Sequence, residues 1–180
     1  AVDFMVCLAL TNTRGADPEP TWGFLIGPPG SAKTELLRNL MNWSHVTSVD
    51  ELTTNSLASG YTDDDGRNPS LLPILDGRLL VIKDFTTLIQ SPPVIRNKIM
   101  GTLRAAFDDT YAKADGHSGL QAYKCKFGIL AAVTGVVDDF LQEDQQLGQR
   151  FVGIRIARTS PSIAARRDAR EACARRLKIA

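Results

Sequence analysis

The sequence predicts a doubly wound α/β domain in which helices flank a five-stranded parallel sheet. Five short apolar runs alternate with segments of helical periodicity, an order typical of consecutive βαβ units. The runs are apolar at nearly every position, as are strands that helices cover on both faces. With 180 residues, of which 43% are hydrophobic, the chain is long enough to bury one core of this kind.

The first half of the chain contains three of the predicted strands. Residues 2–10 form an apolar helix, and a stretch rich in proline and glycine separates it from the first strand, residues 21–26. Apolar residues then recur at helical spacing over residues 33–41. The second strand is predicted at residues 45–50. The third, at residues 77–85, has the strongest strand pattern in the chain.

The second half adds two strands and the helices between them. A serine followed by two prolines starts a helix with one apolar face over residues 91–108. Buried strands are predicted at residues 126–134 and 151–156, with a short helix at residues 136–146 between them. These elements complete the sheet.

A phosphate-binding loop joins the first strand to the helix that follows it. GPPGSAKT fits the P-loop pattern GxxxxGK[ST] except at Ala32, where the pattern has glycine. A methyl group is tolerable there if the backbone stays at negative φ. Lys33 would contact the β- and γ-phosphates, and Thr34 would offer its hydroxyl to Mg²⁺. The alternative is a Pro/Gly turn that happens to precede a lysine. The predicted nucleotide-binding residues are Gly27, Pro28, Pro29, Gly30, Ser31, Ala32, Lys33 and Thr34.

The loop resembles that of the AAA+ ATPases, whose usual spelling is GPPGxGKT. The resemblance covers roughly residues 20–160, with the family's other motifs in the correct order. It implies a P-loop NTPase fold, ATP and Mg²⁺ as cofactors, and ATP hydrolysis in a ring of identical subunits that we expect to be hexameric. It also implies a nucleotide-binding core at residues 1–160 and a C-terminal helix at residues 161–180 that begins the family's lid.

The acid that holds the water shell of Mg²⁺ in this family matches Asp84, at the end of the third strand. The next position is normally a glutamate that orients the attacking water, and here it is Phe85. Some P-loop ATPases carry this glutamate on an adjacent strand, so Glu51 is the candidate base. The alternative for Glu51 is an acid that complements the dipole at a helix N-terminus.

Two more positions of the family have counterparts. Thr134, at the end of the fourth strand, matches the sensor 1 residue and would contact the attacking water or the γ-phosphate; alternatively, it only caps the strand. Arg150 matches the arginine finger that reaches the neighbouring subunit's γ-phosphate, a contact worth about 10³ to 10⁵ in rate. The alternative for Arg150 is a surface arginine in a loop. Arg155, inside the last strand, is the poorer match.

A hairpin is predicted between the long helix and the fourth strand, turning at DGHSG. Several helicase-like AAA+ groups carry a hairpin here that points into the pore and touches DNA. By that resemblance Lys113, His117 and Lys124 would contact backbone phosphates, and Tyr111 or Tyr123 would stack on bases. The alternative is an ordinary solvated hairpin.

Bulk composition adds further expectations. A formal charge of +1 provides no overall attraction to nucleic acid or membranes. No stretch reaches the roughly 18 apolar residues of a membrane span, and we expect a cytoplasmic protein without a membrane partner. Cys7, Cys125 and Cys173 lack metal-binding spacing and are expected to be reduced and buried.

The function that the resemblance implies is ATP-driven remodelling or translocation of DNA for a phage or mobile element. Phe85 keeps open a second possibility, an ATP-dependent switch or scaffold with little hydrolysis. A MoxR-like remodeller of proteins is a third. A small-molecule kinase is a fourth, and the segment around Arg150 argues against it.

Overall fold

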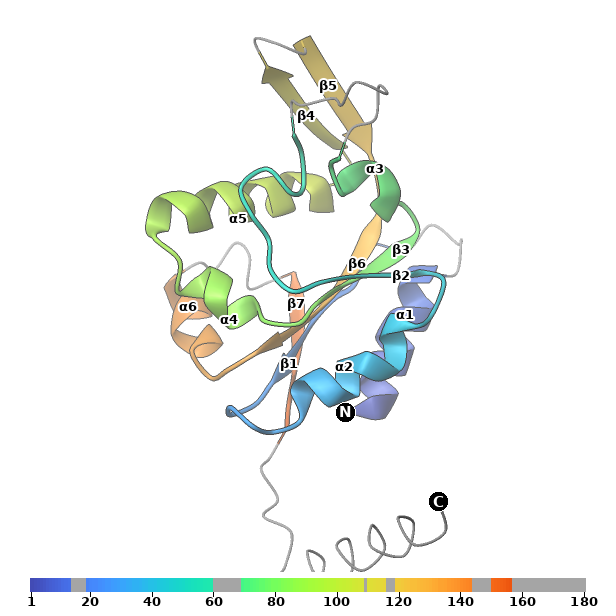
Figure 1. The fold of residues 1–180 in the computed structure, drawn as a ribbon, viewed down its shortest axis with the longest axis vertical. Coiled ribbons are helices and arrows are strands. Elements are labelled where there is room, and N and C mark those ends of the chain that lie inside the picture. The colour runs from blue at the N-terminus through green and yellow to red at the C-terminus, as the bar shows by residue number, and fades with distance from the viewer. Residues whose placement is uncertain (14–18, 60–68, 109, 116–118, 144–149, 157–180) are drawn as a thin grey trace, which may run out of the picture.

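The computed structural model of the chain describes residues 1–13, 19–59, 69–108, 110–115, 119–143 and 150–156. Its centre is a five-stranded sheet in the order β2-β3-β6-β1-β7, with every neighbouring pair parallel. The predicted α/β architecture is therefore confirmed, with helices on both faces of the sheet (Figure 1). The strands of the sheet are β1 (Trp22–Ile26), β2 (Val46–Val49), β3 (Arg78–Ile82), β6 (Phe127–Val133) and β7 (Phe151–Arg155). The helices are α1 (Val2–Thr13), α2 (Lys33–Met41), α3 (Leu72–Leu75), α4 (Phe85–Ile89), α5 (Pro93–Phe107) and α6 (Val137–Glu143).

The direction of each connection decides which face a helix covers. From β1 the chain crosses to the far edge at β2, and the later connections return across the sheet toward β7. Because crossovers between parallel strands are right-handed, connections that run in opposite directions lie on opposite faces. Accordingly, α2 shares one face with α1, whereas α4, α5 and α6 cover the other (Figure 1).

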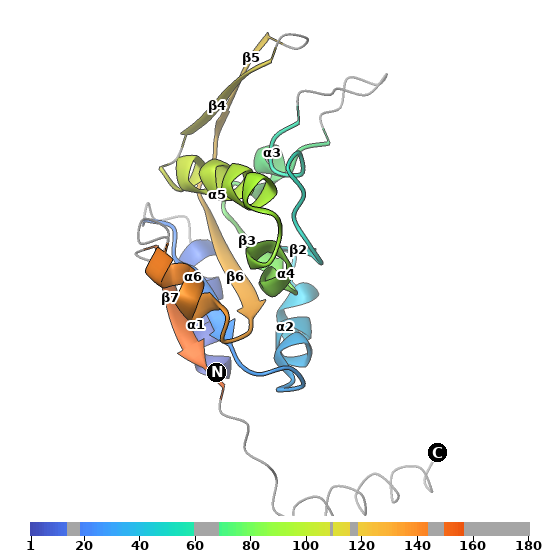
Figure 2. The same cartoon turned by 90° about the vertical axis from the view of Figure 1, so that its left-hand side faces the viewer.

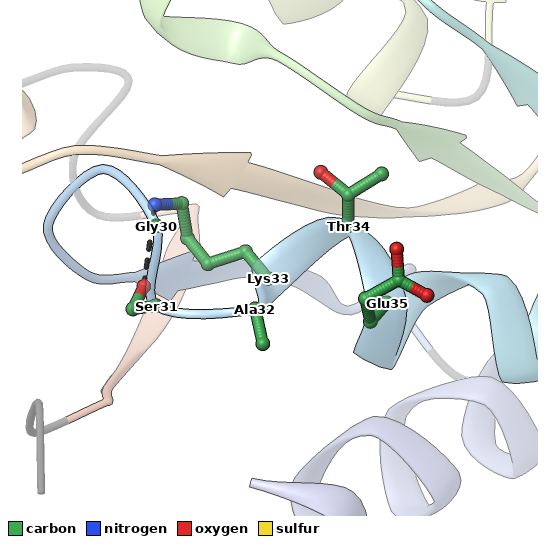
Figure 3. Close-up of a pocket in the computed structure, with 6 residues that line it drawn as sticks. All are labelled: Gly30, Ser31, Ala32, Lys33, Thr34 and Glu35. Carbon is green, nitrogen blue, oxygen red and sulfur yellow. Dashed lines mark hydrogen bonds between the residues drawn. The ribbon is translucent and has the colours of Figure 1, made fainter. Parts of the chain in front are cut away.

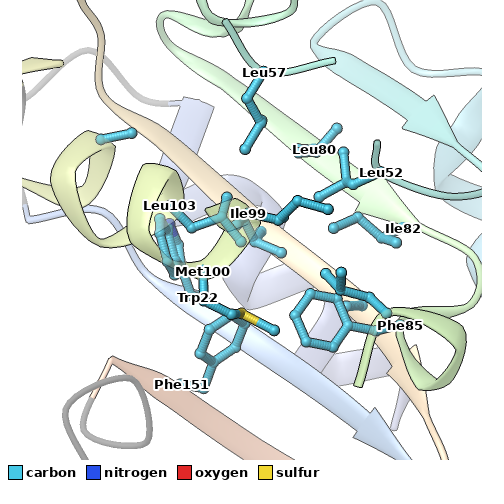
Figure 4. Packing of buried hydrophobic residues seen from close by; sticks show 14 of the residues in the cluster. Trp22, Leu52, Leu57, Leu80, Ile82, Phe85, Ile99, Met100, Leu103 and Phe151 are labelled. Atoms are coloured by element: carbon cyan, nitrogen blue, oxygen red, sulfur yellow. The ribbon is translucent and has the colours of Figure 1, made fainter. Parts of the chain in front are cut away.

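The sheet is the centre of the core. Strands β1 and β6 are buried at every position, as expected for strands covered by helices on both faces. Trp22, at the start of β1, is fully buried, and its indole Nε1 donates a hydrogen bond to the Phe127 carbonyl at 2.9 Å. Figure 4 shows Trp22 in the cluster that also contains Phe85 and Phe151. This cluster lies between the sheet and helices α4 and α5.

Helix α1 approaches the sheet closely at a strand glycine. A Cβ added to Gly128 would lie only 2.2 Å from the side-chain Cγ of Asn12. The same asparagine joins α1 to the start of β1, since its Nδ2 donates to the Thr21 carbonyl at 2.9 Å and its Oδ1 accepts from the Thr21 N–H at 3.0 Å. The helix predicted at residues 2–10 is thus confirmed, and it extends to Thr13.

Strands β4 (Thr110–Asp115) and β5 (Gly119–Lys124) form the predicted antiparallel hairpin. It projects from the end of the domain opposite to the loop between β1 and α2, as two views show (Figures 1 and 2). The turn residues 116–118 lie outside the described part of the chain.

Several sequence expectations were wrong or stay untested. The third strand ends at Ile82, and Phe85 begins helix α4, which the sequence did not reveal; neither did it reveal α3. Cys7 is exposed, contrary to expectation, whereas Cys125 is buried. The predicted helix at residues 161–180 and Cys173 lie outside the described residues. Within the part that the structure describes, no helix is long and apolar enough to cross a membrane.

Candidate functional site

The candidate site lies at the carboxyl ends of the central strands. Helix α2 leaves β1 toward one face of the sheet, and α6 leaves the adjacent strand β6 toward the other. Where neighbouring parallel strands send their connections to opposite faces, a crevice opens at their carboxyl ends, and ligands of open α/β sheets bind there. The loop GPPGSAKT begins at this point.

The loop between β1 and α2 is a tight turn that suits glycine at two positions. Gly27 extends the ladder, since its N–H donates to the Val133 carbonyl at 3.1 Å. A Cβ at Gly27 would lie 2.6 Å from Ser31 Oγ, and Gly30 has a φ of +74°. A pocket opens at the loop (Figure 3), and the residues that line it are Gly30, Ser31, Ala32, Lys33, Thr34 and Glu35.

The Lys33 amine folds back over its own loop. Its Nζ donates to the carbonyls of Gly27 at 2.7 Å and Pro28 at 2.9 Å, and lies 3.4 Å from Ser31 Oγ (Figure 3). Burial lowers the pKa of Lys33, and the nearby negative charge of Asp84 acts in the opposite direction.

From the sequence, alanine at position 32 was tolerable only if its backbone stayed at negative φ. The structure contradicts this condition. Its φ is +60° and its ψ is 23°, the left-handed conformation in which the P-loop pattern places glycine. Such a conformation costs a residue with a Cβ roughly 1–2 kcal/mol. The carbonyl of Ala32 still accepts the first hydrogen bond of α2, from the Leu36 N–H at 3.0 Å. The turn is thus formed at the expense of backbone strain.

Replacing Ala32 with glycine is expected to raise the free energy of unfolding by about 1 kcal/mol, because glycine adopts this φ without strain. Urea denaturation followed by circular dichroism measures the change. Ala122→Gly is the control: Ala122 is exposed on β5, is not among the residues at positive φ, and its replacement should lower stability. A stability of Ala32→Gly equal to or below that of the wild type would contradict the strain.

Asp84 lies two residues after the end of β3 and caps helix α4. Its Oδ1 accepts the Thr86 N–H at 3.0 Å and its Oδ2 accepts the Thr87 hydroxyl at 2.9 Å. Thr134 follows β6, the neighbouring strand, and its N–H donates to Thr86 Oγ1 at 3.1 Å. The structure thereby brings Asp84 and Thr134 together beside the loop that carries Lys33. Sequence reasoning did not single out Thr86, the residue that joins them.

Phe85 occupies the position where the resemblance would place a glutamate, and it belongs to the core. Its side chain is fully buried, with its ring centroid 5.2 Å from that of Phe24 and 6.1 Å from that of Phe151 (Figure 4). A carboxylate in this position would be surrounded by aromatic rings and would lose its hydration without gaining a charged partner. The residue after Asp84 is part of the core of this chain.

Glu51 is not gathered with the other predicted site residues. It is exposed and follows β2, the edge strand, which lies three strand spacings, or about 14 Å, from β1. The residue before it, Asp50, pairs with Lys83 Nζ at 2.7 Å. The alternative, that Glu51 complements the dipole at a helix N-terminus, is wrong, because residues 51–59 contain no helix. Its role as a base stays a prediction.

Arg150 lies at the amino end of β7, whereas the phosphate loop of its own chain lies at the carboxyl ends of the strands. Its guanidinium stacks over the Phe107 ring at 5.0 Å, and its Nη2 is 3.6 Å from Asp108 Oδ1. Arg155, at the other end of β7, is beside the loop strand and pairs with Asp138 at 2.5 Å, a hydrogen bond that raises its pKa. The strand register that places Arg155 there could not be read from the sequence.

The hairpin does not present its predicted contacts on one surface. Lys113 is opposite Gln121 and Lys124 is opposite Thr110, so the two lysines point to different faces of the two-stranded sheet. The rings of Tyr111 and Tyr123 stack on one another at 6.5 Å and pack against the core. His117 lies outside the described residues.

The site fits a metal ion that binds mainly through phosphate and water. Among the described residues, no group of three or more His, Cys, Asp or Glu side chains could hold a metal by itself. Mg²⁺ needs no such group, because it keeps several waters and binds one or two protein oxygens together with substrate phosphates. The Thr34 hydroxyl, in the first turn of α2, is exposed (Figure 3). It and the Asp84 carboxylate are the two oxygens that could bind the ion.

A scan of this chain against models of protein families finds no match, and a search of curated proteins finds none either. What the site can do follows from its own residues.

Proposed function

We propose that this chain is the nucleotide-binding core of an AAA+ ATPase and that its P-loop NTPase fold binds ATP and Mg²⁺. The observation that carries the proposal is the loop GPPGSAKT, which leaves the carboxyl end of β1 and opens helix α2 at the crevice of a parallel sheet. Asp84 and Thr134 follow the next two strands of that sheet, where the resemblance requires them.

Each residue of the loop then has a physical task. The backbone N–H groups at the start of α2 would bind the phosphates, and the helix dipole would favour their negative charge. Lys33 would exchange the carbonyls of Gly27 and Pro28 for phosphate oxygens. Thr34 and Asp84 would hold Mg²⁺, which screens the charge that develops as the γ-phosphoryl group transfers.

We propose that the chain assembles into a ring in which Arg150 is the arginine finger. Arg150 lies at the amino end of β7, away from the loop of its own chain, so the nucleotide that it contacts would belong to a neighbouring subunit. The work that we propose for the ring is remodelling or translocation of DNA for a phage or mobile element, with the hairpin β4–β5 as the contact. Burial of Phe85 favours a second candidate, a switch or scaffold that binds ATP and hydrolyses it slowly.

Steady-state ATP turnover distinguishes these functions. We expect turnover to rise with protein concentration and with single-stranded DNA, and to fall in both Glu51→Gln and Arg150→Ala. Arg78→Ala is the control for Arg150. Arg78 also lies at the amino ends of the strands, and in the described structure it binds only the Ser44 carbonyl.

The other outcomes are equally informative. Tight ATP binding without turnover, unchanged by DNA, would favour the switch. Stimulation by a protein instead of DNA would favour the MoxR-like remodeller. An unchanged rate in Glu51→Gln would exclude Glu51 as the base on the adjacent strand.

A further inference from the structure

We infer that Thr86 is a positioning residue for ATP hydrolysis, acting through the hydroxyl group of Thr134. The inference rests on the proposed function and adds to it a residue that replaces the missing glutamate in part. It starts from the contacts at the carboxyl ends of β3 and β6, where the two threonines meet.

Phe85 and Thr86 are consecutive residues in the first turn of α4 and have different surroundings. The Phe85 side chain is buried in the core, whereas the Thr86 hydroxyl contacts Thr134 at the end of β6. The Thr86 N–H is fixed by Asp84 Oδ1 at 3.0 Å, and its hydroxyl oxygen accepts the Thr134 N–H at 3.1 Å. Thr86 is therefore held from both sides, between the predicted metal-site acid and the predicted sensor.

The remaining hydrogen of the Thr86 hydroxyl has an acceptor nearby. A threonine hydroxyl carries one donor and two lone pairs, and the Thr134 N–H already occupies one lone pair. The Thr86 hydroxyl faces Thr134 Oγ1 at 3.5 Å. This is longer than an ordinary O–H···O bond, and catalytic hydrogen bonds are often long before substrate binds. When Thr86 donates to Thr134, the Thr134 hydrogen is left to point away, toward a water or a phosphate oxygen.

That orientation is what phosphoryl transfer needs. The water oxygen bonds to the γ-phosphorus, and the bond from phosphorus to the β–γ bridging oxygen breaks with its electron pair remaining on ADP. The water proton passes to an oxygen of the released phosphate. Because the transition state is loose, positioning and charge stabilisation contribute more than a strong base. A hydroxyl pair in fixed orientation can therefore assist where position 85 holds no carboxylate.

A double-mutant cycle tests the inference. Kinetics and ATP affinity are measured for the wild type, Thr86→Val, Thr134→Val and the double variant, with Thr86→Ser as the conservative replacement. We expect Thr86→Val to lower kcat about tenfold, the effect of one lost hydrogen bond, with the Kd for ATP within about twofold. Serine should restore kcat. In the Thr134→Val background the Thr86→Val change should have little further effect.

Thr102→Val is the matched control, because among the described residues the Thr102 hydroxyl bonds only the Lys98 carbonyl, on α5 and away from the site. Thermal melting checks the fold of each variant, and Thr86→Ala replaces Thr86→Val if the latter does not fold.

Three results would overturn the role of Thr86: an unchanged kcat in Thr86→Val, multiplicative losses in the double variant, or a loss that serine does not restore. If the wild type bound ATP without hydrolysing it, the role of Thr86 in hydrolysis would be contradicted, whereas the proposed nucleotide binding would stand. Failure of the wild type to bind ATP would instead contradict the proposed function.

Discussion

Replacing Lys33 with alanine is expected to weaken ATP binding by about 10²- to 10³-fold, the loss of two charge-assisted hydrogen bonds. The reason lies in the present partners of Lys33. Its amine rests on the carbonyls of Gly27 and Pro28, where phosphate oxygens would be stronger partners for a cation. Isothermal titration calorimetry with a non-hydrolysable ATP analogue measures the change in Kd.

Two comparisons make the Lys33 result specific. Lys98→Ala removes a lysine from α5, where it contacts Asn55, and should leave the Kd unchanged. The melting temperature of Lys33→Ala shows whether the loop still folds. ATP binding retained at wild-type affinity in a folded Lys33→Ala would remove the basis of the proposed function.

The Asp84→Asn change is expected to lower turnover on the order of 10²-fold or more, with a smaller effect on the fold. Asparagine keeps an oxygen that can accept the Thr86 N–H, and it is as good a helix N-cap as aspartate. It removes the negative charge that would hold the hydrated Mg²⁺. The measurement is the steady-state rate of phosphate release over a range of Mg²⁺ concentrations.

Asp76→Asn is the control for Asp84. Asp76 also accepts a backbone N–H, that of Lys126 at 2.9 Å. It lies before β3, at the amino ends of the strands, whereas Asp84 lies at their carboxyl ends. Its replacement should leave the Mg²⁺ dependence unaltered. If Asp84→Asn kept the turnover and the Mg²⁺ dependence of the wild type, Asp84 would not be the metal-site residue.

The elements with strong local patterns could be predicted. Residues 33–41 form a helix with the predicted bounds, and each of the five predicted segments along the chain contains a strand of the sheet. Helix α4 could not be found this way, because it has only five residues and begins at Phe85, shortly after β3 ends at Ile82. Short elements are decided by packing, since one turn carries too few residues to show a period.

The sequence by itself determined the fold class, the position of the phosphate loop and the hairpin, because apolar periodicity and glycine turns are local properties of the chain. Only the tertiary structure decided which residues share the site. Thr134 meets Thr86, whereas Glu51 is on an edge strand and Lys113 and Lys124 face apart. Such proximity depends on strand order and register, which bring together residues far apart in the sequence. The left-handed φ of Ala32 and the burial of Phe85 likewise follow from the surrounding fold.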